Sequence, residues 1–289
     1  MYAITGVTGT IGGIVASNLL AANLPVRAIV RNPEKARAWA DRGCELAQAD
    51  IFDSVALTNA FQEAEAVFIL VPPLFDPASG FPEARAIAAS LKSALIASCP
   101  ARTVYLSTIG AQATQINLLT QHTIIERELR TLSLPITFLR PAWFLENFAW
   151  AVAPARVNHL IHSFLQPLDR HLSMVATADI GDLAAELLQL PFTGHQTVEL
   201  EGPALVTPQD AAATLAELLG HPVNIEAVPR ESWLQLFESQ GMKNPTSRIH
   251  MLDGFNEGWI CFEGAPSTIR KGKTTLRTVL QSLLKPTPE

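Results

Sequence analysis

The first thirteen residues, MYAITGVTGTIGG at positions 1–13, decide the fold. A strand-like run from Tyr2 to Thr5 meets three spaced glycines, and an apolar helical run from Ile14 to Leu20 follows. In such a unit the first glycine allows a tight turn, the second lets the backbone approach a phosphate, and the third lets the helix pack closely on the strand. The helix N-terminus then offers free N–H groups and the positive end of its dipole to an anion.

We therefore expect this loop to hold the pyrophosphate of a dinucleotide. The residues expected to contact it are Gly6, Thr8, Gly9, Thr10, Ile11 and Gly12. The spacing is G-x-x-G-x-x-G rather than G-x-G-x-x-G, so an ordinary turn between a strand and a helix is the alternative. The strand before the loop and the helix after it favour the nucleotide site.

Composition excludes several classes of protein. The 289 residues are 48% hydrophobic and 17% charged, which indicates a well-filled core. A net charge of −6 without a basic stripe argues against nucleic acid as a partner. The three cysteines, Cys44, Cys99 and Cys261, are too widely spaced for a disulfide framework or a thiolate zinc site, and the histidines lack acidic partners in a metal-binding pattern. We expect no metal site.

No stretch suits a membrane span. The longest apolar run, from Ala66 to Phe75, is interrupted by Pro72 and Pro73 and is too short to cross a bilayer. The first strand begins at Met1, which leaves no room for a signal peptide. We expect a cytoplasmic protein with no membrane partner.

Strands and helices alternate through the first half of the chain. The expected strands are 2–5, 26–30, 44–49, 66–71, 103–107 and 136–140, and the expected helices are 33–42, 54–64 with Ser54 as N-cap, 82–98 and 119–132. Alternation at these lengths predicts right-handed crossovers and an α/β fold with a doubly wound parallel sheet.

The regular alternation of expected strands and helices ends after Pro141. Residues 142–171 are rich in aromatic side chains and are expected to be helical or irregular, whereas a strand at 173–177 and a helix at 179–190 return to the sheet. Strands at 197–201 and 224–228, with a helix capped by Thr207 and opened by Pro208, complete a smaller α/β lobe. The predicted division is a nucleotide-binding domain of residues 1–141 plus about 172–192, and a substrate lobe of about 142–171 and 193–289.

The end of the second expected strand indicates which nucleotide binds. NAD sites usually place an acidic residue there to bind the ribose 2′-OH, but this strand ends in Arg31, and Lys35 follows. A guanidinium would bind a 2′-phosphate, so NADP(H) is expected in preference to NAD(H). The alternative is that Arg31 is an ordinary solvated charge. Other strand ends expected to line the cofactor carry Asp50, Ile51, Val71, Pro72, Ser107 and Thr108.

The common tyrosine–lysine pair of short-chain dehydrogenases is absent. The two tyrosines, Tyr2 and Tyr105, are followed four residues later by Gly6 and Ile109. Without that acid, reduction of a simple ketone is disfavoured. His122 is the candidate catalytic residue in the corresponding helix, as a proton donor or substrate-orienting group, and Glu126 one turn later is expected to hold its other nitrogen. The alternative is a polar helix residue without a chemical role.

These segments together resemble the NmrA-like group of atypical short-chain dehydrogenases. The matching pieces are ITGVTGTIGG, AIVRNPEKA, the segment around Asp50, FILVPP, the helix from His122 and LRPAWFLENF at 139–148. The resemblance implies NADPH along the glycine loop and at Arg31, with Pro141 and Phe144 on its nicotinamide side. It also implies a pocket for a flat, electron-poor or cationic aromatic compound between the nicotinamide and the second lobe. Trp143 and Phe148 would contribute to this pocket unless they are core residues of the lobe.

The resemblance implies direct hydride transfer without metal or flavin. We therefore expect an NADPH-dependent reductase of a small aromatic acceptor such as a quinone. Because the same family includes regulators that bind a dinucleotide without catalysis, a redox sensor is the first alternative. An iminium or enoyl reductase of a biosynthetic pathway is the second, and the apolar composition leaves a homodimer open.

Overall fold

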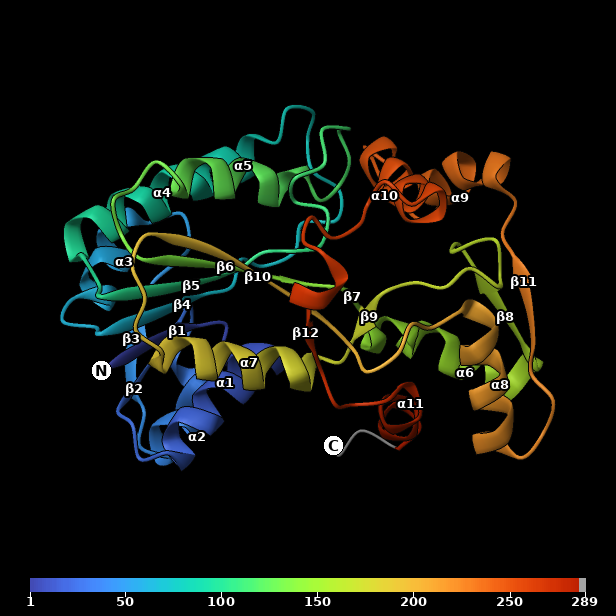
Figure 1. The fold of residues 1–289 in the computed structure, drawn as a ribbon, viewed down its shortest axis with the longest axis horizontal. Helices are drawn as coiled ribbons and strands as arrows, with labels where there is room; N and C mark the ends of the chain where they lie inside the picture. Colours follow the sequence, from blue (N-terminus) through green and yellow to red (C-terminus); the bar gives the residue numbers. More distant parts are fainter. Residues whose placement is uncertain (286–289) are drawn as a thin grey trace.

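The computed structural model describes residues 1–285. Its centre is an eight-stranded sheet in which every neighbouring pair is parallel (Figure 1). The strands are β1 (Tyr2–Thr5), β2 (Val26–Val30), β3 (Glu45–Gln48), β4 (Ala66–Ile69), β5 (Arg102–Leu106), β6 (Ile136–Pro141), β10 (His195–Glu201) and β12 (Arg270–Lys271). Their spatial order is β12-β10-β6-β5-β4-β1-β2-β3. The expected doubly wound parallel sheet is confirmed, and its order reverses between β1 and β4.

Helices cover both faces of this sheet. One face carries α1 (Thr10–Ala21), α2 (Arg37–Asp41) and α7 (Thr177–Gln189), and the other carries α3 (Ser54–Phe61), α4 (Pro82–Ser98) and α5 (Thr120–Leu129) (Figure 1). Successive side chains of a strand point to opposite faces, so Val104 packs in the core under α1 and α7, whereas Tyr105 packs in the core under α4 and α5. This alternation directs Tyr105 towards α5.

The smaller lobe lies beyond the carboxyl end of β6 (Figure 1). It contains α6 (Ala149–Asn158), α8 (Pro208–Leu219), α9 (Trp233–Ser239), α10 (Thr246–Glu257), α11 (Leu276–Leu283) and a parallel pair of strands, β8 (Leu160–Ser163) and β11 (Asn224–Ala227). A second short pair, β7 (Trp143–Phe144) and β9 (Met174–Val175), lies between the lobe and the main sheet. Trp233 and Phe237 are fully buried in the lobe's own core.

The division of the chain differs from the sequence-based one. The strand β10, which was assigned to the lobe, pairs with β6 along six positions and therefore belongs to the main sheet. The expected strand at 173–177 is reduced to β9 and pairs with β7, outside the main sheet. Residues 160–163 form a strand that was not expected. A short apolar run shows that a strand can form but not which partner it will find, because pairing is a long-range contact.

Local helix boundaries follow the sequence closely, with one correction. Asp53, rather than Ser54, caps α3, because its Oδ1 accepts hydrogen bonds from the backbone N–H groups of Val55 and Ala56. The predicted cap of α8 is confirmed. Thr207 accepts from the N–H of Asp210, whose carboxylate accepts from the N–H of Thr207, and Pro208 occupies the first helical position.

Candidate active site

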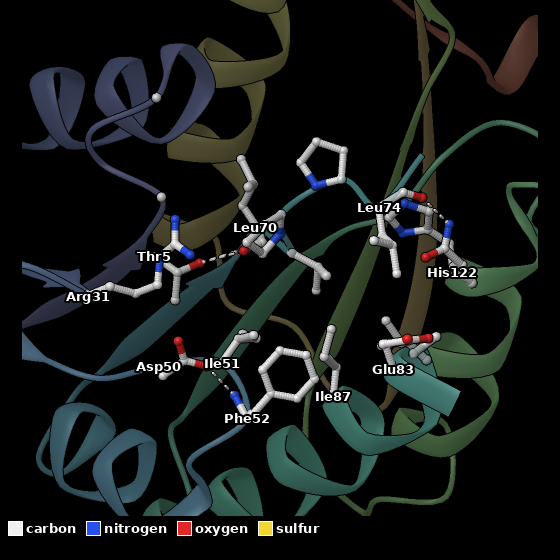
Figure 2. A pocket seen from close by; sticks show the side chains of 18 of the residues that line it. Thr5, Arg31, Asp50, Ile51, Phe52, Leu70, Leu74, Glu83, Ile87 and His122 are labelled. Atoms are coloured by element: carbon white, nitrogen blue, oxygen red, sulfur yellow. Dashed lines mark hydrogen bonds between the residues drawn. The ribbon is translucent and has the colours of Figure 1, made fainter. Parts of the chain in front are cut away.

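A cavity of about 510 Å³ opens where the carboxyl ends of β1 and β4 diverge. In open α/β sheets, ligands bind at this reversal of strand order, because the connections leave in opposite directions and a crevice remains. Figure 2 shows Arg31 and Asp50 on one side of the cavity and His122 and Glu83 on the other. Thr5 joins the two strands at its floor, since its hydroxyl accepts from the N–H of Leu70 at 2.7 Å and donates to the Leu70 carbonyl at 3.2 Å.

The glycine loop is shaped for an anion. Gly6 has φ of +70°, which disfavours other residues, and a Cβ on Gly12 would lie 2.3 Å from the Gly6 carbonyl oxygen. Thus helix α1 packs directly on the turn. At its N-terminus, Gly9 supplies no side-chain cap, and the first turn carries no acidic residue. Uncapped N–H groups at the positive end of the helix fit a pyrophosphate.

The strand ends place Arg31 and Asp50 at the same side of the cavity. Arg31 is exposed and lines the cavity, and Asp50 accepts a hydrogen bond from the N–H of Phe52 at 3.0 Å. Lys35 is exposed in the 3-10 helix Pro33–Ala36, which replaces the first turn of the helix expected at 33–42, and it does not line the cavity. Of these two cations, Arg31 is therefore the one that lines the cavity.

The cavity brings together only part of the residues named from the sequence. Those that line it are Gly6, Thr8, Gly9, Arg31, Asp50, Ile51, Val71, Pro72 and His122. Those that do not line it are Thr10, Ile11, Gly12, Lys35, Ser107, Thr108, Glu126, Pro141, Trp143, Phe144 and Phe148. The second group includes both proposed substrate-binding residues and one of the two proposed catalytic residues.

The partner of His122 is Tyr105 and not Glu126. Tyr105 and the Nδ1 atom of His122 share a hydrogen bond of 2.8 Å. Burial lowers the pKa of His122 from its ordinary 6.5 to about 4, against the opposing charge of Glu126, so the imidazole is neutral at neutral pH. Burial and the Glu126 charge raise the pKa of Tyr105 well above its ordinary value, which keeps the phenol protonated and able to donate. Proton donation by an imidazolium near neutral pH is therefore not supported.

Glu126 forms a buried ion pair with Arg140. Its two oxygens accept hydrogen bonds from Arg140 at 2.9 and 2.7 Å, and one also accepts from the hydroxyl of Ser107 at 2.6 Å. Burial raises the pKa of Glu126, but the hydrogen bonds and charge of Arg140 outweigh it, and the pKa lies below its ordinary value. Since Arg140 is only 3% exposed, its charge needs this partner. Glu126 is fixed as a structural carboxylate.

Two of the aromatic residues after β6, Trp143 and Phe148, pack in the core of the lobe. Phe148 is 6% exposed within its core, and Trp143 packs edge-to-face on Phe255 with ring centroids 4.7 Å apart. Neither side chain lines the cavity, so their contact with a substrate stays a prediction. Glu146 caps α7, because its carboxylate accepts from both the N–H and the hydroxyl of Thr177. Helix capping therefore accounts for this residue of the LENF segment.

The structure adds residues that sequence reasoning missed. Leu74 and Phe75 stand at the cavity mouth, and Phe75 is 62% exposed. They belong to the mouth loop, which we define as residues 70–80. Asp76 attaches this loop to the smaller lobe by accepting from the N–H groups of Lys243 and Asn244. Pro72 and Pro73 indicated a loop at this position in the sequence. Nothing in the sequence indicated that Asp76 would contact the segment around Lys243.

Most of the chain matches one known protein family. Residues 2–258 match the NmrA-like family. The chain belongs to this family. Among the relatives of this NmrA-like protein, quinone oxidoreductase 2 of Escherichia coli strain K12 is 29% identical over 246 residues, covering 84% of this chain and 82% of the relative. NAD(P)H azoreductase of Xenophilus azovorans is 27% identical over 261 residues, covering 89% and 85%.

Solved structures show the same fold over nearly the whole length. The NADPH-dependent quinone oxidoreductase of Escherichia coli, complexed with NADPH, superposes with a TM-score of 0.81 at 26% identity, covering 99% of this chain and 100% of the other. The Citrobacter triphenylmethane reductase complexed with NADP(H) has a TM-score of 0.81 at 24% identity, covering 98% and 99%.

Within residues 1–285, no helix has the length and apolarity to span a bilayer, and no three side chains gather as metal ligands.

Proposed function

We propose that this NmrA-like protein is an NADPH-dependent reductase that transfers hydride directly to a flat aromatic acceptor such as a quinone. The observation that carries the proposal is a single cavity with an uncapped glycine-loop helix and Arg31 at one side and His122 at the other. The relatives support the reaction class, since they are named as a quinone oxidoreductase and an azoreductase. The quinone oxidoreductase structure, which contains NADPH, supports the cofactor.

Different residues of the cavity would bind different parts of NADPH. The N–H groups of the glycine loop and of the first turn of α1 would hold the pyrophosphate. Arg31 would bind the 2′-phosphate through charge-assisted hydrogen bonds, which gives the preference for NADP(H) over NAD(H). Ile51 and Val71 would contribute apolar contacts at the strand ends. When bound, NADPH supplies a hydride, which is two electrons and one hydrogen nucleus.

The role of His122 is to orient the acceptor. When Tyr105 donates to Nδ1, the proton of the neutral imidazole resides on Nε2, which can donate a hydrogen bond. A quinone that accepts a hydride becomes a hydroquinone anion and takes its remaining proton from water, so a strong acid is not required. Catalysis then depends on positioning, which agrees with the missing tyrosine–lysine pair.

The test is a cofactor titration followed by a single turnover. Purified protein is titrated with NADPH and NADH, and oxidation of bound NADPH is followed by stopped flow after addition of 1,4-naphthoquinone. Tighter binding of NADPH and its rapid oxidation are expected. Tight binding without oxidation by quinone, azo or iminium acceptors would contradict the reductase and favour the redox sensor, whereas an absence of binding would contradict the nucleotide site itself.

A further inference from the structure

Two histidines of the smaller lobe face each other at the start of its parallel strand pair. The Nδ1 atoms of His159 and His221 lie 2.7 Å apart, and the two ring centroids are separated by 4.0 Å. The residues are 62 positions apart in the chain, so no short metal-binding spacing connects them in the sequence. Neither residue lines the cavity at the carboxyl ends of β1 and β4. The proposed reaction therefore gives this pair no role.

The fold brings the two histidines together through two similar connections. His159 ends α6 and leads into β8, and His221 follows the end of α8 and leads into β11. Because β8 and β11 are parallel neighbours, their amino ends lie at the same edge, and the N–H of Asn224 donates to the carbonyl of His159 at 2.8 Å. Figure 1 shows both helices and both strands together in the smaller lobe. Each histidine thus stands at a helix C-terminus, where the helix dipole favours a positive charge.

The carbonyl of Pro222 completes a triangle of three potential ligand atoms. Its oxygen lies 3.1 Å from Nδ1 of His221 and 3.4 Å from Nδ1 of His159. Two ligand atoms of one tetrahedral zinc ion, each at about 2.1 Å from the metal, lie about 3.4 Å apart. The triangle therefore approximates one face of such a tetrahedron. Its shortest edge, between the two Nδ1 atoms, opens by a small rotation of the exposed His159 ring.

The three atoms of the triangle can accept a cation in place of a proton. A hydrogen bond between two Nδ1 atoms needs one N–H group and one lone pair, and the Pro222 oxygen can only accept. In the other tautomer of a neutral histidine the proton lies on Nε2, and the Nδ1 lone pair is free. A metal ion can then contact two imidazole nitrogens and one oxygen. Imidazole ligands suit Zn²⁺, Cu²⁺ and Ni²⁺, whereas Mg²⁺ and Ca²⁺ prefer oxygen ligands.

We propose that His159, His221 and the carbonyl of Pro222 bind a divalent transition-metal ion such as Zn²⁺. Water completes the coordination, because the site lies at the surface. The ion joins the connection between α6 and β8 to the connection between α8 and β11. Since unfolding separates the two histidines, binding stabilises the folded lobe. The site does not depend on the proposed reductase function, because neither histidine lines the cavity.

Zinc binding is measured on untagged, chelator-treated protein by competition with a chromophoric zinc chelator at neutral pH. We expect one zinc ion per chain, bound at least about tenfold more weakly by His221→Gln and by His159→Asn. Asparagine is chosen at position 159 because the backbone there has φ of +56°, which asparagine tolerates. His162→Gln is the matched control, since it removes an exposed histidine of β8 outside the triangle. It should change the affinity by less than about twofold.

Electron paramagnetic resonance with Cu²⁺ as the probe identifies the ligand atoms independently. Wild type should show superhyperfine coupling to two imidazole nitrogens, and either single variant should show one. Zn²⁺ should also raise the thermal unfolding midpoint of wild type but not of the two variants, whose urea midpoints in the presence of EDTA verify that they fold. Wild-type zinc affinity in both variants, an equal loss in His162→Gln, or no zinc binding by wild type would overturn the proposal.

Discussion

Arg31 follows the carboxyl end of β2 and is the residue to which we assign the proposed choice of cofactor. It is exposed and lines the cavity beside Asp50 (Figure 2). The neighbouring Lys35, which was expected to assist it, does not line the cavity. The proposal therefore assigns the discrimination between a 2′-phosphate and a 2′-hydroxyl group to a single guanidinium.

The charge reversal Arg31→Glu tests this assignment. A charge-assisted hydrogen bond contributes about 1.5–3 kcal/mol, which corresponds to roughly 10- to 100-fold in a dissociation constant. We expect NADPH binding to weaken by that factor and NADH binding to change little, as measured by fluorescence titration. Arg127→Glu, an exposed charge on α5 outside the cavity, is the matched control. Equal weakening of both nucleotides by Arg31→Glu would contradict the role.

The pKa of His122 predicts a flat pH profile. An imidazole with its ordinary pKa of 6.5 would change charge between pH 5 and 8, but burial lowers the pKa of His122 to about 4. It is protonated only below that pH, so its charge does not change in the neutral range. We expect kcat/KM for a quinone to stay constant from pH 6 to 8. A bell or step centred near pH 6.5 would show that an imidazolium takes part.

Removal of the imidazole tests whether His122 orients the acceptor. The loss of one hydrogen bond corresponds to about 1–1.5 kcal/mol, so His122→Ala should lower kcat/KM for the acceptor roughly tenfold. The dissociation constant of NADPH should not change, because the histidine lies away from Arg31. Tyr105→Phe should reproduce part of the loss by releasing the ring. Unchanged turnover and acceptor affinity in His122→Ala would show that the residue has no chemical role.

At the scale of elements, the mouth loop connects the two parts of the molecule. Residues 70–80 follow β4, and Asp76 accepts two backbone hydrogen bonds, at 2.8 and 2.6 Å, from the segment before α10. On the other side, the side-chain amide of Gln121 donates to the carbonyl of Leu74 at 2.9 Å. The cavity mouth is thereby held between α5 and the smaller lobe.

Asp76→Ala is expected to release this loop. Both backbone N–H groups lose their acceptor, so Leu74 and Phe75 are no longer held over the mouth. We expect faster proteolytic cleavage within residues 72–80 and a higher KM for the acceptor, while the urea midpoint of global unfolding changes little, because the loop is exposed. Limited proteolysis with mass spectrometry measures the cleavage. A cleavage rate equal to that of wild type would contradict the anchoring role.

At the scale of the whole molecule, buried ionisable groups couple stability to pH. The folded protein keeps His122 neutral between its ordinary pKa of 6.5 and about 4, whereas the unfolded chain binds a proton there. The unfolding free energy therefore falls as pH decreases through this range. Glu126 acts in the same direction at lower pH, because its folded pKa lies below its ordinary 4.5, and its ion pair with Arg140 is lost as the carboxylate is protonated.

Urea unfolding at a series of pH values measures this dependence. In His122→Gln, which does not titrate, the slope of the unfolding free energy against pH between 6.5 and 4.5 should be smaller than in wild type. The absolute stability of the variant does not enter the comparison. Identical slopes would show that the histidine is not held neutral by the fold.

Local sequence was sufficient for the features that depend on neighbouring residues. The glycine loop, the strands of the first half and the capping of α8 by Thr207 were predicted because turn geometry, alternation and capping act over a few positions. Arg31 was placed at the cavity for the same reason, since it follows directly from the end of a strand. The family assignment rests on these local segments and was confirmed over residues 2–258.

Only the tertiary structure decided what distant residues do to one another. Glu126 lies one helical turn from His122, which suggested a pair, but Arg140 and Ser107, which the fold brings beneath α5, take the carboxylate instead. Phe148 matched the family pattern and is buried in the lobe core. The physical reason is that hydrogen bonds, burial and pKa depend on the surroundings in space, and the sequence orders residues only along the chain.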